Sequence, residues 1–129
     1  MVVADWGAYS GVAGSREIFD GPAARALCAE LESQGLGRVL VTFGVADGPT
    51  FTIGLGAEDS CAAYWESADP PYYESVGSLP ADALIDDAYD TQHSELPGTV
   101  RIPKSLALDG LAEFVETGRR PSSITWTET

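Results

Sequence analysis

Residues 39–100 constrain the fold more than any other part of the chain. This stretch carries eleven Asp or Glu residues, no Lys or Arg and one histidine, and its apolar residues alternate with polar ones. Alternation with a period of two is typical of half-buried strands, so we predict a packed sheet here. A sheet whose exposed positions carry one sign of charge is poorly suited to nucleic acid or anionic lipid. It is well suited to a basic partner.

The strands of this sheet can be placed by their alternation and by the turns between them. Val39, Val41, Phe43 and Val45 point one way, and Asp47-Gly48 is a hairpin signal. We expect strands at residues 38–46, 51–55, 60–66, 72–76 and 84–91.

Two amphipathic helices flank the central stretch. Asp20 can cap a helix that has Pro22 in its first turn and ends at Gly35 or Gly37. The second helix begins at Pro103, and Gly118 and Pro121 end it. The expected buried stripes are Ala24, Leu27, Cys28 and Leu31 in the first helix, and Ala107, Leu108, Leu111, Phe114 and Val115 in the second.

The order of elements indicates an α+β fold. Residues 2–9 are expected to form a first strand with Trp6, residues 10–14 a loop, and residues 124–126 a last short strand. We therefore predict one domain, residues 1–129, with an antiparallel sheet of about five to seven strands. The two amphipathic helices pack on one face of that sheet.

Composition indicates a folded acidic protein. The chain has 129 residues, twenty acidic against seven basic, which gives a net charge of −13 and a pI of about 4.1. It shows neither a signal-peptide pattern nor an apolar run long enough for a membrane span. Cys28 and Cys61 are expected to be buried reduced thiols. We expect a cytoplasmic protein that does not bind membranes.

Catalytic or metal chemistry has weak support. Asp86, Asp87, Asp90 and His93 would share one face of a helix, whereas on a strand they fall on both faces. Hydrolytic or acyl-transfer chemistry needs a nucleophile and a base that lie close together. The chain has a single histidine, and nothing in the sequence places a nucleophile beside it. Gly54-Leu55-Gly56 resembles the start of a phosphate-binding loop, but it leads to acidic residues rather than to a helix N-terminus, so we do not expect it to bind phosphate. We expect no enzyme, no cofactor and no metal. A small metal-binding domain or enzyme using Asp86, Asp90 and His93 remains the alternative.

Aromatic and acidic residues mark candidate contacts with a partner. Trp and Tyr are enriched at interface hot spots, and a charged rim influences association rate and partner choice. The candidates are Trp65, Glu66, Asp69, Tyr72, Tyr73, Glu74, Asp86, Asp87 and Asp90. In the alternative, Trp65 is a core residue and the tyrosines only cover the surface. Arg119-Arg120 is expected to offset the dipole of the preceding helix.

The C-terminal third resembles bacterial immunity protein family one. The resemblance rests on Arg101-Ile102-Pro103, on the helix end Glu113-Phe114-Val115-Glu116-Thr117-Gly118-Arg119-Arg120-Pro121, and on Ile124-Thr125-Trp126-Thr127-Glu128. Residues His93, Glu95 and Pro97 are similar to the tract before that helix. The match covers about forty residues.

This resemblance implies an immunity protein of a bacterial polymorphic toxin system. Members are made beside a toxin, often one with a nucleic-acid deaminase domain, and they block its active site without catalysis of their own. The partner implied by the resemblance is then a basic toxin domain with deaminase activity, bound 1:1. An acidic protein can occupy the basic groove that such a toxin needs for its substrate.

Overall fold

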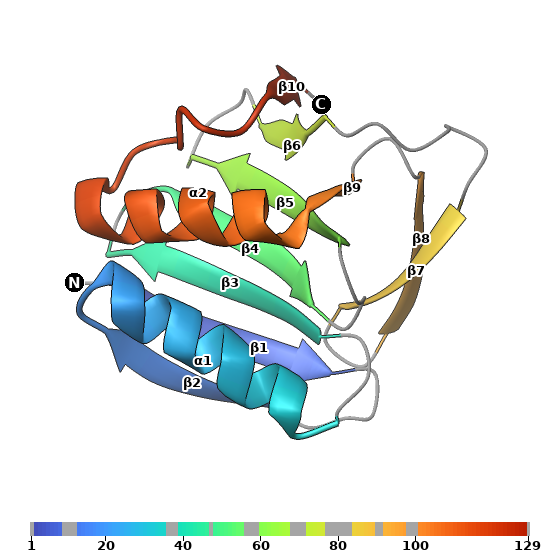
Figure 1. Ribbon diagram of the computed structural model, residues 1–129, viewed down its shortest axis with the longest axis horizontal. Helices are drawn as coiled ribbons and strands as arrows, with labels where there is room; N and C mark the ends of the chain where they lie inside the picture. Colours follow the sequence, from blue (N-terminus) through green and yellow to red (C-terminus); the bar gives the residue numbers. More distant parts are fainter. Residues whose placement is uncertain are drawn as a thin grey trace.

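The computed structural model describes residues 2–8, 13–35, 39–46, 48–55, 60–67, 72–76, 84–89, 92–97 and 101–128. In chain order they form β1 (Val2–Ala8), β2 (Ala13–Ile18), α1 (Gly21–Ser33), β3 (Val39–Val45), β4 (Thr50–Leu55), β5 (Ser60–Glu66), β6 (Tyr73–Ser75), β7 (Leu84–Tyr89), β8 (Gln92–Pro97), β9 (Arg101–Pro103), α2 (Lys104–Thr117) and β10 (Trp126–Glu128). Both helices lie on the same face of one sheet (Figure 1).

The main sheet has eight strands within the described ranges. Its order is β10-β6-β5-β4-β3-β1-β2, with β9 paired to β5 off this path, and all of its pairings are antiparallel. Since β2 and β3 both run antiparallel to β1, α1 connects two strands that flank a third. The hairpin β7–β8 is a separate sheet whose first strand contacts β1 and β3.

Local sequence explains where α1 begins and ends. The Asp20 side chain accepts a hydrogen bond from the Ala23 N–H at 2.8 Å and so satisfies one of the free donors of the first turn. Gln34 is the C-cap, and Gly35 follows with φ of +67°, a conformation that glycine adopts without steric penalty. The buried stripe consists of Gly21, Ala24, Leu27, Cys28 and Leu31.

The second helix is ended in a similar way. Gly118 has φ of +70°, and its N–H donates to the Phe114 carbonyl at 2.7 Å. Ala107, Gly110, Leu111 and Phe114 are its buried residues, whereas the expected core positions Leu108 and Val115 are only half-buried.

The core lies between the two helices and the sheet. Alternate residues of the central strands, such as Phe43, Phe51 and Ile53, are fully buried. The rings of Phe51 and Phe114 stack with centroids 5.8 Å apart. Full burial of one such side chain contributes roughly 1.5–3 kcal/mol. The other residues of these strands belong to the opposite face of the sheet, which we call the open face because both helices lie on the other side.

The structure confirms the predicted fold class, but four strands differ from the prediction. Strands β2, β8 and β9 were not predicted, and Ala13 and Gly14 of β2 had been assigned to a loop. The last strand begins at Trp126, two residues later than expected. Of β2, only Ile18 is buried, so an edge strand of this kind gives no hydrophobic alternation. Ile124 is buried against α2 instead of pairing with the sheet.

Two further expectations concern the cysteines and the membrane. Cys28 and Cys61 are buried and are not joined in a disulfide, as predicted. Neither α1 nor α2, the helices of the described part, is long and apolar enough to cross a bilayer.

Candidate functional site

The predicted contact residues of β5 and β6 lie on opposite faces of the sheet. Trp65 pairs with Tyr73, and Tyr64 pairs with Glu74. Because consecutive strand residues point to opposite faces, Trp65 and Tyr73 share the helix side with the buried Phe51. Glu66 and Glu74 therefore belong to the open face. The sequence had grouped the aromatic and acidic residues together, and the strands separate them.

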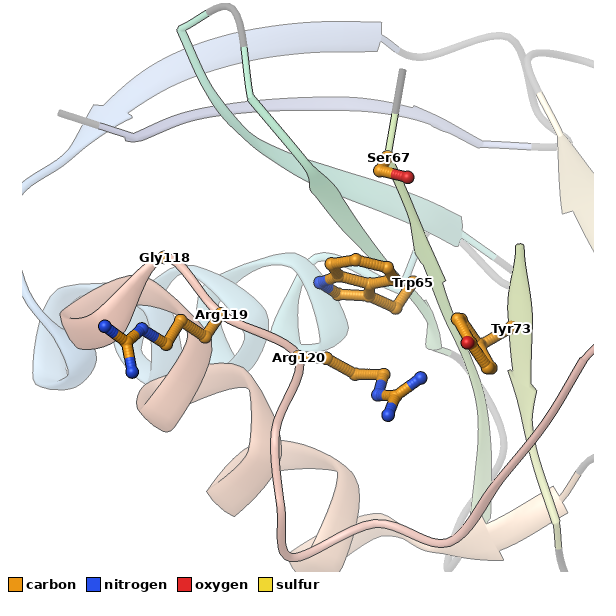
Figure 2. A pocket seen from close by; sticks show the side chains of 6 residues that line it. All are labelled: Trp65, Ser67, Tyr73, Gly118, Arg119 and Arg120. Carbon is orange, nitrogen blue, oxygen red and sulfur yellow. The ribbon is translucent and has the colours of Figure 1, made fainter. Parts of the chain in front are cut away.

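On the helix side, aromatic rings and arginines surround a shallow, open depression of about 540 Å³. The centroids of Trp65 and Tyr73 are 5.8 Å apart, and their planes are tilted by 54°. The Arg120 guanidinium lies 4.1 Å from the Tyr73 centroid and 5.9 Å from that of Trp65. Figure 2 shows the lining residues, which are Trp65, Ser67, Tyr73, Gly118, Arg119 and Arg120.

The chain between α2 and β10 brings Arg120 into this position. Gly118 turns the backbone out of the helix. The Trp126 indole N–H then donates to the Pro121 carbonyl at 2.9 Å, and the Glu113 carboxylate accepts from the Ser122 N–H at 2.8 Å. These bonds fix the segment that carries Arg119 and Arg120 against the end of the helix. Arg120 thus contacts rings of β5 and β6, a position that a role in offsetting the helix dipole did not predict.

The depression is cationic, in contrast to the rest of this acidic protein. No ion pair joins Arg119 or Arg120 to a carboxylate in the described part of the chain. The Trp65 Nε1 atom is buried and has no hydrogen-bond acceptor among those residues. This half of the predicted contact set therefore offers donors and aromatic surface.

The open face carries acidic and hydroxyl side chains in two rows that cross the sheet. One row contains Ser15, Asp5, Thr42, Thr52, Tyr64 and Glu74, and the other contains Glu17, Val3, Gly44, Thr50 and Glu66. Asp5 and Glu74 are four strands apart, a span of about 19 Å at the usual strand spacing. The centre carries short hydroxyl side chains, and the Thr42 and Thr52 hydroxyl oxygens are 3.0 Å apart.

The described basic side chains all lie on the helix side, and three of them are paired there. Arg16 binds Glu30 at 2.7 Å, Lys104 binds Glu32 at 2.6 Å, and Arg25 binds Asp109. The hydrogen bond with Arg16 and its charge lower the pKa of the Glu30 carboxyl below its usual value. Asp5, Glu17, Glu66 and Glu74 have no such partner among the residues whose side chains are described. Three acidic side chains of the helix side are therefore paired with a basic group, whereas none of the described acidic side chains of the open face is.

The remaining predicted contacts are placed only in part. Tyr72 is exposed just before β6. Asp86 and Asp87 are neighbouring positions of β7, in register with Glu95 and Ser94 of β8. Asp69 and Asp90 lie outside the described residues. Asp5 and Glu17 were missed, although Asp5 alternates with Val2, Ala4 and Trp6 in a predicted strand and could have been placed on the exposed face.

The described residues bring together no set of groups suited to catalysis or metal binding. The metal alternative relied on helical spacing of Asp86, Asp90 and His93, but Asp86 lies in a strand, as does His93, which pairs with Ala88. No cluster of three potential metal ligands occurs within the described part. Burial raises the pKa of the Cys28 thiol to about 12, so it is a poor nucleophile.

Comparison with known proteins agrees with the resemblance read from the C-terminal third. The family model for immunity protein Imm1 matches residues 22–128, from the first turn of α1 to the last residue of β10. No curated protein gives a significant match. The matched range includes both helices, the depression and most of the open face. The chain therefore belongs to the Imm1 family of immunity proteins.

Proposed function

We propose that this protein neutralises a cognate toxin that acts on nucleic acid, a deaminase or another nucleic-acid-modifying enzyme, by placing its open face over the toxin's basic substrate groove. It does so in the cytoplasm as a 1:1 complex, without catalysis of its own. Membership of an immunity protein family supports binding to a toxin. That the toxin acts on nucleic acid is inferred from the charge of the open face, and that it is a deaminase is what the family resemblance implies.

One observation carries this proposal: the described charges of the open face are all acidic and lack a basic partner. Asp5 and Glu17 lie at one side of the face, and Glu66 and Glu74 lie at the other. An enzyme that binds nucleic acid must attract phosphates with Lys and Arg. Carboxylates presented across about 19 Å can occupy the same basic groove.

The shape of the open face fits a close approach. Thr42, Thr52, Gly44 and Thr50 occupy its centre, and none of them is a long side chain that would have to be ordered on binding. The hydroxyl groups can bond to basic side chains of the partner while the flanking carboxylates supply charge. Such an arrangement favours fast association as well as specificity.

The test uses the cognate toxin domain, which the family resemblance leads us to expect in the gene beside this one. The purified domain is assayed on its nucleic-acid substrate with the wild-type protein, with the double variant Glu66→Gln/Glu74→Gln, and with Glu116→Gln. Glu116 is an exposed glutamate of α2 with no described ion pair, so its replacement changes the charge on the other side of the molecule. We expect full inhibition by the wild type and Glu116→Gln, and inhibition at least tenfold weaker by the double variant.

Competition identifies the surface of the toxin that is blocked. An oligonucleotide substrate should displace the wild-type protein from the toxin, since both occupy the basic groove. If substrate and inhibitor bind the toxin together, or if the double variant inhibits as well as the wild type, the proposal is wrong.

A further inference from the structure

We propose that the depression formed by Arg120, Tyr73 and Trp65 is a binding site for carboxylates, and that its ligand is an acidic segment of a protein partner. This site lies on the helix side, away from the open face. Binding at this depression therefore does not depend on whether the open face binds a toxin.

The first observation is the state of Arg120. Its guanidinium lies 4.1 Å from the centre of the Tyr73 ring, a distance at which an arginine stacks or makes a cation–π contact. A guanidinium held over a ring by such a contact can keep N–H donors available for a ligand. No hydrogen bond or ion pair of the described residues uses the donors of Arg120. An arginine that is held by a ring and has unused donors is preorganised to bind a carboxylate with two parallel hydrogen bonds.

The second observation is the unsatisfied indole of Trp65. Its Nε1 atom is buried and has no acceptor among the described residues, and a buried donor in that state costs about 1–3 kcal/mol. The indole nitrogen is turned toward the side of the depression where Gly118 and Arg119 lie (Figure 2). A ligand oxygen that enters on this side would supply the missing acceptor.

The third observation is that nearby carboxylates leave the arginines unpaired. Glu113 is engaged with the N–H and hydroxyl groups of Ser122. Glu128 of β10 is paired in register with Tyr73 of β6, yet it forms no described ion pair with Arg120. Elsewhere on the helix side Arg16, Arg25 and Lys104 are each matched with an acidic residue. Two exposed cations without such partners are thus exceptional in a chain with a net charge of −13.

The acidity of the whole protein favours a peptide carboxylate over a nucleic-acid phosphate. A polyanion would be repelled by the surrounding charge over the length of its contact, whereas a short acidic segment presents its charge only at the depression. A volume of about 540 Å³ is large enough for a few side chains. The rings of Trp65 and Tyr73 supply apolar contact beside the charge.

The test uses the whole chain labelled with ¹⁵N and follows the Trp65 indole N–H signal, which the spectrum of Trp65→Phe assigns. The titrants are an acetylated tetrapeptide with two adjacent glutamates, the same peptide with two glutamines, inorganic phosphate and a short single-stranded DNA. We expect the acidic peptide to shift the Trp65 signal and the glutamine peptide to leave it unchanged. Arg120→Gln should weaken the interaction at least fivefold.

Matched variants separate this site from general charge effects. Arg16→Gln removes an arginine that is already paired, and it should leave binding of the acidic peptide unchanged. Arg120→Lys keeps the charge and loses the planar guanidinium, so we expect it to weaken peptide binding less than Arg120→Gln does. If Arg120→Gln fails to fold, Arg120→Lys still tests the site. Equal binding of the two peptides, equal losses with Arg16→Gln and Arg120→Gln, or a Trp65 response to DNA or phosphate but not to the acidic peptide would each overturn the assignment.

Discussion

Close contacts at single residues position the segment that shapes the depression. A Cβ at Gly110 of α2 would lie 2.4 Å from Ile124 Cδ1, so only glycine lets Ile124 pack this tightly against the helix. Ile124 lies just before β10. Trp126, the first residue of β10, donates a hydrogen bond from its indole N–H to the Pro121 carbonyl. One glycine therefore influences where the chain returns to the sheet.

Gly110→Ala is expected to destabilise the protein although alanine is the better helix former. The gain in helix propensity is about 1 kcal/mol, whereas overpacking a filled core costs about 1–3 kcal/mol. We predict a net loss of up to about 2 kcal/mol in urea unfolding. Ile124→Val removes Cδ1, so the double variant Gly110→Ala/Ile124→Val should be more stable than the sum of the two changes predicts. Simple additivity would contradict the contact.

The Cys28 thiol predicts a pH dependence. Burial, with a smaller contribution from Cys61, raises its pKa to about 12. In the unfolded chain a thiol ionises near pH 8.5, so the unfolded state loses a proton first as pH rises. Stability is fully present below that pH and falls by about 1.4 kcal/mol per unit as pH rises toward 12.

The free energy of unfolding of Cys28→Ala, measured beside the wild type, isolates this effect. Other titrating groups are common to both proteins and cancel. We expect the wild type to lose roughly 1 kcal/mol relative to Cys28→Ala between pH 7.5 and pH 9.5. A difference that stays constant over this range would mean that Cys28 is accessible to solvent.

At the scale of elements, the sequence predicted those helices and strands that are specified by a buried face or by capping residues. Both helices were found because their apolar stripes and their Asp20 and Gly118 ends are local signals. The central strands were found because one face is buried. Strands β2 and β9 were missed because an exposed edge strand and a three-residue strand owe their existence to a neighbour rather than to their own pattern.

The connection between α2 and β10 is held by specific hydrogen bonds, which gives a prediction for that element. Trp126→Phe keeps an aromatic ring beside Phe51 but removes the donor to the Pro121 carbonyl. We expect a loss of about 1 kcal/mol beyond that of Trp6→Phe, since no described hydrogen bond involves the Trp6 indole. Urea unfolding of the two variants measures this difference. Equal losses would show that the bond does not contribute.

For the whole molecule, strand alternation converts an acidic sequence into two unlike surfaces. The sequence predicted an excess of negative charge and the residues that carry part of it. It could not show that Trp65 and Tyr73 face away from Glu66 and Glu74, because that depends on which side of β5 the helices cover. Nor could it show that Arg120 comes from the end of α2 to lie over Tyr73, since this is a contact between residues 47 positions apart in the chain.

The central claim is that the uncompensated charge of the open face attracts the toxin. Electrostatic steering raises association rate constants from about 10⁵–10⁶ M⁻¹s⁻¹ toward about 10⁸–10⁹ M⁻¹s⁻¹ at low salt. Salt screens such steering over about 10 Å at 0.1 M. The rate constant and its dependence on salt therefore report the charges directly, whereas dissociation depends more on short-range contacts.

The most direct measurement is the association rate constant with the toxin domain as a function of salt, for wild type, Glu66→Gln/Glu74→Gln and Glu116→Gln. We predict that the double variant associates several-fold more slowly at low salt and has a flatter salt dependence. Glu116→Gln should follow the wild type closely. Three superimposable curves, or a larger effect from Glu116 than from the open-face pair, would contradict the account.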